Sequence, residues 1–253
     1  MYVSTIGIIG AQGRFGQHLC RRLGAILVQS ATLVPSTDKS SNEEIVRRSD
    51  VIILTVRPDQ VEKALEDIPD VLRLRRNVVS FAARTPGLIL ESRIIGVTRI
   101  MVDPWWNMCG WVRNSSELSN EKFDSLFGNL TRMKPLELDE NAELDIYSML
   151  LAHLMVVLLF EKLNRVGNVE RHLEFLAHEF SRFNRTFQPD EFRNFELGNN
   201  PEESLRELAT PGGITEAVIK ALQKTHEPLE VHRRTIITLG WSEFLSNNVF
   251  RGS

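Results

Sequence analysis

The chain has 253 residues, of which 42% are hydrophobic and 25% are charged, and its formal net charge is −3. This composition is that of a globular protein and excludes a disordered or fibrous chain. A slight acidic balance without a basic stripe argues against a nucleic-acid-binding protein. Two cysteines in so long a chain provide no disulfide framework.

The apolar segments predict no targeting or membrane-spanning element. The N-terminus has no basic region before its first apolar run, so no signal peptide is expected. The longest apolar stretch, residues 147–160, is shorter than the roughly 20 residues that span a bilayer. We expect it to lie in a core or at a subunit interface. The sequence therefore predicts a soluble, cytoplasmic protein that binds no membrane.

The first hundred residues alternate between strand-like and helix-like segments. Short β-branched runs, typical of strands buried on both faces, lie at residues 5–10, 51–56, 77–82 and 93–98. Helical segments separate them at residues 13–23, 41–48 and 58–66. This alternation predicts a doubly wound α/β domain with a parallel sheet.

After residue 118 the strand signals fade and the sequence predicts only helices. These are expected at residues 121–130, 140–165, 169–184, 190–196, 213–224 and 228–247, with a capping box at residues 200–203. The segment 99–117, which contains three tryptophans, is the expected boundary. We therefore predict two domains, an α/β domain at residues 1–118 and an all-helical domain at residues 119–253.

Three glycines after the first strand predict a dinucleotide site. Gly10, Gly13 and Gly16 have the spacing G-x-x-G-x-x-G and open the first helix. Gly10 would permit the tight turn, Gly13 the approach of a pyrophosphate, and Gly16 close packing of helix on strand. The anion would lie on N–H groups at the helix N-terminus. A glycine-rich turn without a ligand is the alternative.

The adenosine half of the fingerprint is weak. Residues 26–36 contain no acidic side chain to bind the ribose of NAD, and Asp38 comes late. Lys39 is the one nearby cation for the 2′-phosphate of NADP. The chain between Gly24 and Ser41 is too short for a strand, a helix and a further strand. The sequence therefore favours NADP over NAD and predicts an abbreviated adenosine pocket.

Four further segments carry a resemblance to one enzyme family. They are NEEIVRRSDVIILTVRP at residues 42–58, SFAA at 80–83, RIM at 99–101 and TPGGIT at 210–215. In this order they resemble pyrroline-5-carboxylate reductase, whose family joins a Rossmann-like domain to a helical dimerisation domain. The resemblance spans most of the chain, and the Pro-Gly-Gly segment is its most specific part.

The resemblance implies an activity and a set of site residues. The activity is NAD(P)H-dependent reduction of the C=N bond of a small cyclic imine carboxylate, in proline biosynthesis, by a homodimer formed through the helical domain. Cofactor contacts are implied for Gly10, Ala11, Gln12, Gly13, Arg14, Phe15, Gly16, Asn42, Thr55, Val56, Arg57, Pro58, Phe81, Ala82 and Ala83. Substrate contacts are implied for Thr210, Gly212, Gly213 and Thr215, and catalytic roles for Asp103 and Thr215.

Departures from the family pattern leave other interpretations open. Asp103 replaces an asparagine, Arg84 replaces a glycine, and bulky residues at 145–151 replace small ones. A catalytically degenerate relative with a regulatory or assembly role would show such changes. A prephenate dehydrogenase-like oxidoreductase shares the glycine spacing, but residues 20–150 contain no histidine to serve its chemistry.

Several residues have a structural alternative to a functional role. Asp103 would orient a protonated imine, or it is a turn residue before a proline. Trp105, Trp106 and Trp111 would line a cleft or pack a core. His153 is expected to be a core histidine. His172 and His178 are six residues apart and do not have helical metal-site spacing, so no metal is expected.

Overall fold

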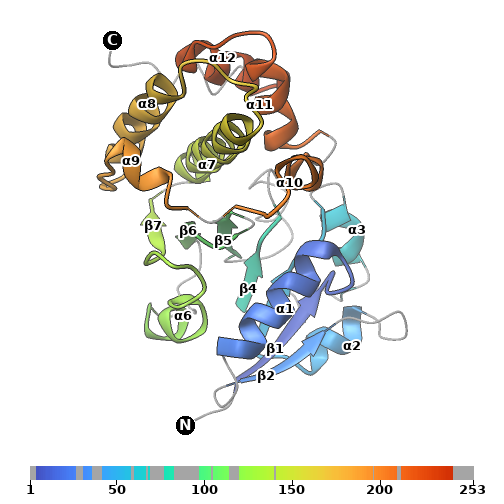
Figure 1. The fold of residues 1–253 in the computed structure, drawn as a ribbon. Coiled ribbons are helices and arrows are strands. Elements are labelled where there is room, and N and C mark those ends of the chain that lie inside the picture. The colour runs from blue at the N-terminus through green and yellow to red at the C-terminus, as the bar shows by residue number, and fades with distance from the viewer. Residues whose placement is uncertain are drawn as a thin grey trace. The chain divides into compact units, whose positions relative to one another are not determined.

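The computed structural model of the protein divides into two compact units, Met1–Leu144 and Asp145–Ser253 (Figure 1). It describes residues 4–26, 31–35, 42–57, 60–66, 68, 77–82, 97–103, 105–113, 120–139, 141–195, 197–209 and 212–241. The expected fold class is confirmed: a Rossmann-like α/β unit is followed by a helical unit.

A seven-stranded sheet forms the first unit, in the order β2-β1-β3-β4-β5-β6-β7. The strands are β1 (Ser4–Ile9), β2 (Ala31–Pro35), β3 (Val51–Leu54), β4 (Asn77–Ser80), β5 (Val97–Val102), β6 (Cys109–Arg113) and β7 (Leu136–Leu138). The first five strands are parallel, β6 is antiparallel to β5, and β7 is parallel to β6. The carboxyl ends of β1 to β5 therefore share one edge, and the strand order reverses between β1 and β3.

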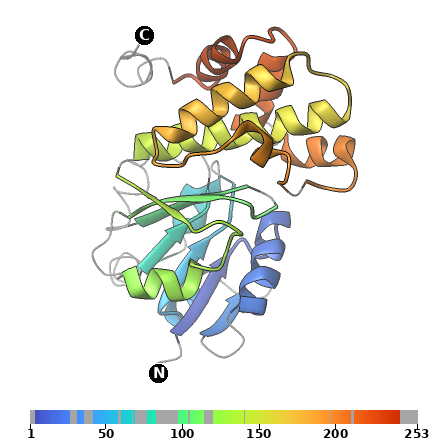
Figure 2. The ribbon, with the colours of Figure 1, turned by 60° about the vertical axis from the view of Figure 1, so that its left-hand side comes forward.

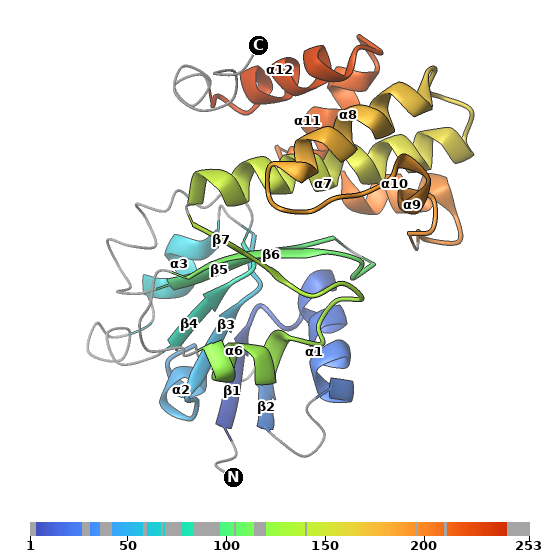
Figure 3. The same cartoon turned by 90° about the vertical axis from the view of Figure 1, so that its left-hand side faces the viewer.

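Helices cover both faces of this sheet, as the apolar strands predict. The helices are α1 (Arg14–Ile26), α2 (Asn42–Arg47), α3 (Val61–Glu66) and α6 (Asn120–Phe127). Alternate strand residues enter two separate apolar clusters, so that Ile53 packs with α1 and α6 whereas Ile52 packs with α2 and α3. Figure 3 shows α6 lying across the strands. All four residues of β3 are consequently buried.

The sheet extends further along the sequence than the strand signals indicated. The last predicted parallel strand, residues 93–98, lies at Val97–Val102, and β2, β6 and β7 were not predicted. The tryptophan-rich segment is not a linker but the β5–β6 hairpin and the turn that joins its strands. Because α6 and β7 complete the first unit, the division falls after Leu144 rather than after residue 118.

The described part of the second unit contains helices and no strand. Its helices are α7 (Asn141–Lys162, which begins in the first unit), α8 (Val169–Ser181), α9 (Pro189–Phe192), α10 (Pro201–Leu208), α11 (Ile214–Leu222) and α12 (Pro228–Thr238). Figures 1 and 2 show α7 surrounded by the other helices. By length and composition α7 could cross a membrane, but 83% of its apolar window is buried by its neighbours, as in a core helix.

The ends of two helices show how local sequence sets their limits. One half of the capping box predicted at residues 200–203 is present, since Asn200 is the N-cap and its side chain accepts a hydrogen bond from the Glu203 N–H at 3.3 Å. The last helix ends at Thr238, earlier than predicted. Gly240 has φ of 69°, and Trp241 N–H donates to the Ile236 carbonyl. This is a Schellman motif, whose glycine ends the helix.

Candidate functional site

The glycine turn joins β1 to α1 with the geometry that its spacing predicts. Gly10 has φ of 88°, and the Gly13 N–H donates to the Gly10 carbonyl at 3.0 Å. A Cβ on Gly16 would lie 2.2 Å from the Gly10 oxygen, so only glycine lets the helix approach the strand this closely. The tight turn and the close helix packing are therefore both present.

The outer side of this turn is open. Among the described residues, a Cβ on Gly13 would have one neighbour within 4 Å, the Gly10 carbonyl oxygen at 3.3 Å. Gln12, Gly13 and Arg14 are exposed, whereas Ala11 is buried. The first-turn N–H groups of a helix have no intrahelical acceptor, and α1 has no acidic residue in its first turn. This helix end is thus electrostatically suited to an anion.

The loop after β3 contacts the glycine turn where the strand order reverses. The Thr55 N–H and its hydroxyl both donate to the Ile9 carbonyl, each at 2.9 Å. A Cβ on Gly10 would lie 2.9 Å from both the Thr55 Oγ1 and the Val56 nitrogen. The structure therefore brings Thr55 and Val56 beside the turn, while the exposed Arg57 follows them. In open α/β sheets, ligands bind in the crevice at this point.

The remaining expected cofactor residues that the structure describes are either hydrogen-bonded within the protein or buried. The side-chain amide of Asn42, expected at the ribose, donates to the Ala64 carbonyl in α3 at 3.1 Å. Phe81 and Ala82 directly follow β4, and both are buried. Three expected site residues, Pro58, Ala83 and Thr210, lie outside the described residues.

An aromatic cluster lies at the carboxyl edge of the sheet. Phe15, in the first turn of α1, has ring-centroid distances of 5.5 Å to Phe81 and 5.7 Å to Trp106. Trp111 instead stacks on Phe123 at 3.8 Å, and both tryptophans are buried in the same apolar cluster. Of the two, Trp106 is the one that contacts Phe15 beside the glycine turn.

Asp103 holds the turn between β5 and β6. Its carboxylate accepts hydrogen bonds from the N–H groups of Trp105 at 3.0 Å and Met108 at 2.6 Å, and from the side-chain amide of Asn107 at 3.0 Å. The side chain is 2% exposed. Burial raises the pKa of Asp103, and these hydrogen bonds counteract the rise. In this arrangement the hydrogen bonds of the Asp103 carboxylate stabilise the turn to which Asp103 belongs.

Gly212 and Gly213, the two glycines of the Pro-Gly-Gly segment, directly precede α11 in the helical unit. Gly212 has φ of 70°, and Gly213 is the N-cap. The Gly212 N–H donates to the Glu216 carboxylate at 2.7 Å, and Lys220 pairs with that carboxylate at 2.9 Å. Hydrogen bonds from Lys220 and then Gly212 lower the pKa of Glu216. A carboxylate of the chain thus already lies beside this helix N-terminus, next to Thr215.

A chain of three buried histidines was not expected from the sequence. His153 Nδ1 lies 2.9 Å from His232 Nε2, and His153 Nε2 lies 3.0 Å from His172 Nδ1. His153 is a core histidine, as expected, and the exposed His178 lies on the other side of α8 from the buried His172. The sequence feature that could have indicated this chain is that each of the three histidines lies on the apolar face of its helix.

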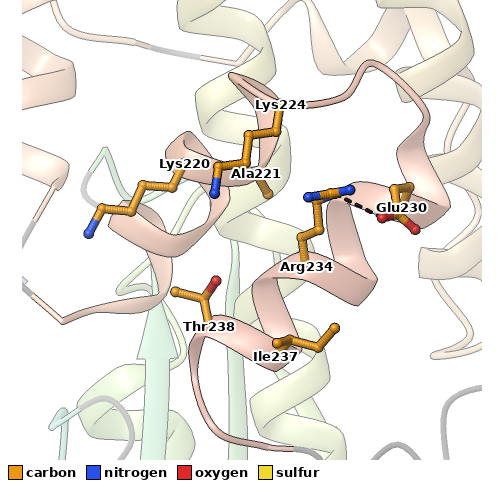
Figure 4. A pocket seen from close by; sticks show the side chains of 7 residues that line it. All are labelled: Lys220, Ala221, Lys224, Glu230, Arg234, Ile237 and Thr238. Carbon is orange, nitrogen blue, oxygen red and sulfur yellow. Dashed lines mark ion pairs between the residues drawn. The ribbon is translucent and has the colours of Figure 1, made fainter.

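A shallow groove of about 420 Å³ lies between α11 and α12 (Figure 4). Lys220, Lys224 and Arg234 line it together with the apolar side chain of Ile237. Arg234 is paired with Glu230 at 2.8 Å. None of the residues that were expected to bind cofactor or substrate lines this groove.

Comparisons with known proteins bear on the first unit most directly. Residues 5–84 match the family model described as NADP oxidoreductase, coenzyme F420-dependent. The matched segment contains the glycine turn and the strands β2, β3 and β4 of the first unit. A search of curated protein sequences found no significant match.

Solved structures with the same fold include pyrroline carboxylate reductases. The NADP-bound enzyme from Plasmodium falciparum is 15% identical with a TM-score of 0.52, covering 95% of this chain and 97% of that one. The enzyme from Coxiella burnetii is 15% identical with a TM-score of 0.52, covering 96% and 99%. That from Streptococcus pyogenes is 15% identical with a TM-score of 0.51, covering 95% and 98%. The predicted resemblance is thus confirmed as a shared fold.

Proposed function

We propose that the protein is an NAD(P)H-dependent reductase of a C=N bond in a small cyclic imine carboxylate. The observation that carries this proposal is the glycine turn, which touches the Thr55–Val56 loop where the strand order reverses. The family model matched by residues 5–84 supports a nicotinamide cofactor. We favour NADP over NAD because residues 26–36 contain no acidic side chain for the NAD ribose.

The residues present fit such a cofactor. A Cβ on Gly10 or Gly16 would clash with the protein, whereas Gly13 is exposed and a Cβ there would contact the Gly10 carbonyl oxygen at 3.3 Å. The exposed first turn of α1 would hold the phosphates, with Arg14 as a nearby cation. Hydride transfer is the chemistry that a nicotinamide supplies when bound.

The substrate carboxylate is assigned to the N-terminus of α11. Gly212, Gly213 and Thr215 frame this end, and the Thr215 hydroxyl would donate to the carboxylate. Glu216 accepts the Gly212 N–H at 2.7 Å and would share the site. An imine that binds already protonated needs no general acid from the chain. Asp103 is assigned a positioning role rather than the catalytic one expected from the sequence, since its carboxylate is used within its loop.

The same proposal includes a cytoplasmic homodimer formed through the helical unit. Two exposed apolar side chains on α12 support it, Leu229 at 40% and Ile237 at 65%. Light scattering on the purified protein, with Ile237→Glu as the variant, tests it. A monomer in the unmodified protein would contradict it.

One observation favours a second candidate, a relative that has lost catalysis. The Asp103 carboxylate and the Gly212 N–H, both in expected active-site segments, are bonded within the chain. Such a protein would keep the fold and act through a protein partner. It would show no turnover with any cyclic imine.

Titration with NADPH and NADH, followed by calorimetry, tests the proposed function. The sharpest variant is Gly13→Asp. Aspartate is a favoured N-cap, so the variant keeps α1, but its carboxylate faces the place of the pyrophosphate. We expect micromolar binding of NADPH that Gly13→Asp abolishes and Gly24→Ala, near the other end of α1, retains. Absence of binding to the unmodified protein at millimolar cofactor would overturn the proposal. Turnover is then measured with cyclic imine carboxylates.

A further inference from the structure

Trp106 has a backbone conformation that is costly for a bulky residue. Its φ is 62°, in the left-handed region. Among the residues that the structure describes, the other positive φ values belong to asparagines and glycines, which adopt this conformation readily. Bulky residues held in such a conformation are concentrated at functional sites, because the surrounding structure must enforce it.

The loop around Trp106 enforces this conformation through its backbone. The Trp106 N–H donates to the Asp103 carbonyl at 3.0 Å, and the Trp106 carbonyl accepts from the Arg132 N–H at 2.9 Å. On either side, the Asp103 carboxylate binds the N–H groups of Trp105 and Met108. Asp103 therefore holds the backbone of the turn that carries Trp106.

The ring points at the nucleotide-binding turn. It stacks on Phe15 with a centroid distance of 5.7 Å and an interplanar angle of 23°. Phe15 is the residue immediately before Gly16 and keeps part of its surface exposed. Phe81, which follows β4, contacts Phe15 from another side. The first turn of α1 and the loops that follow β4 and β5 thus form one aromatic wall at the carboxyl edge.

The topology places this wall on one particular half of a bound dinucleotide. In a doubly wound sheet the adenosine ribose is bound near the end of the second strand, and the other mononucleotide half lies across the switch point. Here β2 lies on one side of β1, whereas β3, β4 and β5 lie on the other. The wall is therefore on the nicotinamide side.

We propose that Phe15 forms the wall against which the nicotinamide ring packs, that the 8% exposed Trp106 supports Phe15 from the core side, and that Asp103 is the positioning residue that fixes Trp106 there. This inference rests on the proposed function. Aromatic rings favour offset or edge contacts with other planar rings, so the wall would orient the nicotinamide and exclude water from one side of it. The rest of the cofactor would not depend on Trp106.

Comparison of two ligands tests the inference. NADPH contains the nicotinamide, and 2′-phospho-ADP-ribose lacks it. The main variant is Trp106→Gly, because glycine adopts the positive φ without strain and preserves the loop. Trp106→Phe retains an aromatic ring, and Trp105→Phe is the matched control in the same loop. Circular dichroism verifies that each variant is folded.

We expect Trp106→Gly to weaken NADPH binding by roughly 3- to 10-fold, the factor that a lost aromatic contact gives. Binding of 2′-phospho-ADP-ribose should stay unchanged, and Trp106→Phe should restore most of the NADPH affinity. An equal loss for both ligands, or a loss for neither, would overturn the inference while leaving the proposed function intact. If the unmodified protein binds neither ligand, the proposed function itself fails.

Discussion

His153 and His172 share a hydrogen bond in the core of the helical unit, with His153 Nε2 3.0 Å from His172 Nδ1, and His232 continues the chain on the other side of His153 at 2.9 Å. The bonds join α7, α8 and α12. A neutral imidazole has one donor and one acceptor nitrogen, so both ring–ring hydrogen bonds can form when all three rings are neutral.

Burial keeps these rings neutral. It lowers the pKa of His232 to about 3 and that of His172 to about 4, and it holds the pKa of His153 well below its usual value. Charge on neighbouring groups adds to the effect, from His226 and Arg171 at His172. Protonation of any of these rings would place a positive charge in the apolar core, where the charged form is unfavourable.

The first prediction is that the helical unit loses stability in acid. An unfolded histidine takes up a proton near pH 6.5, whereas the folded ones do so only near pH 4 or below. The unfolded state therefore binds more protons in this window, and the free energy of unfolding falls as pH decreases through it. His232 alone contributes a loss of about 2 kcal/mol between pH 6.5 and about pH 5.

Urea unfolding at several pH values, followed by circular dichroism, measures this loss. His178→Gln, at an exposed position of α8, should leave the dependence unchanged. His232→Gln should make it shallower. A free energy of unfolding that is constant from pH 7 to about pH 5 would contradict the prediction.

A second prediction compares two glycines of α1. Gly16→Ala should destabilise the first unit by more than about 2 kcal/mol, because its Cβ would lie 2.2 Å from the Gly10 oxygen and 2.8 Å from the Ala11 Cα. Gly24→Ala should stabilise the helix by about 0.5–1 kcal/mol, since its Cβ would meet only Leu33 Cδ1 at 3.9 Å. Thermal unfolding of both variants checks the opposite signs, and equal effects would refute the packing argument.

A third prediction concerns Asp103. Asparagine has one acceptor oxygen, but the side chain here receives donors on both oxygens, including the Met108 N–H at 2.6 Å. Asp103→Asn should therefore leave one buried donor unpaired and cost about 1–3 kcal/mol. The near-ultraviolet circular dichroism of Trp106 should weaken with it. Asp139→Asn, at an exposed position, is the control, and an unaltered Asp103→Asn spectrum would show that Asp103 does not hold the turn.

Much of the first unit was predictable because its signals are local. The runs at 5–10, 51–56 and 77–82 coincide with β1, β3 and β4, three of the five parallel strands, and the glycine spacing describes the turn. The short strand β7 was missed because three residues carry no periodicity, and β6 because a tryptophan-rich segment resembles a junction. Both become strands through pairing with a sheet that already exists.

The sequence by itself determined the features that depend on neighbouring residues: the turn at Gly10, the close approach permitted by Gly16, and the cap at Asn200. Only the tertiary structure decided which side chains meet across the fold. His153 and His232 are 79 residues apart, and Trp106 reaches Phe15 from a loop after another strand. A buried polar or aromatic side chain takes its partner from the elements packed around it, and no local pattern encodes that choice.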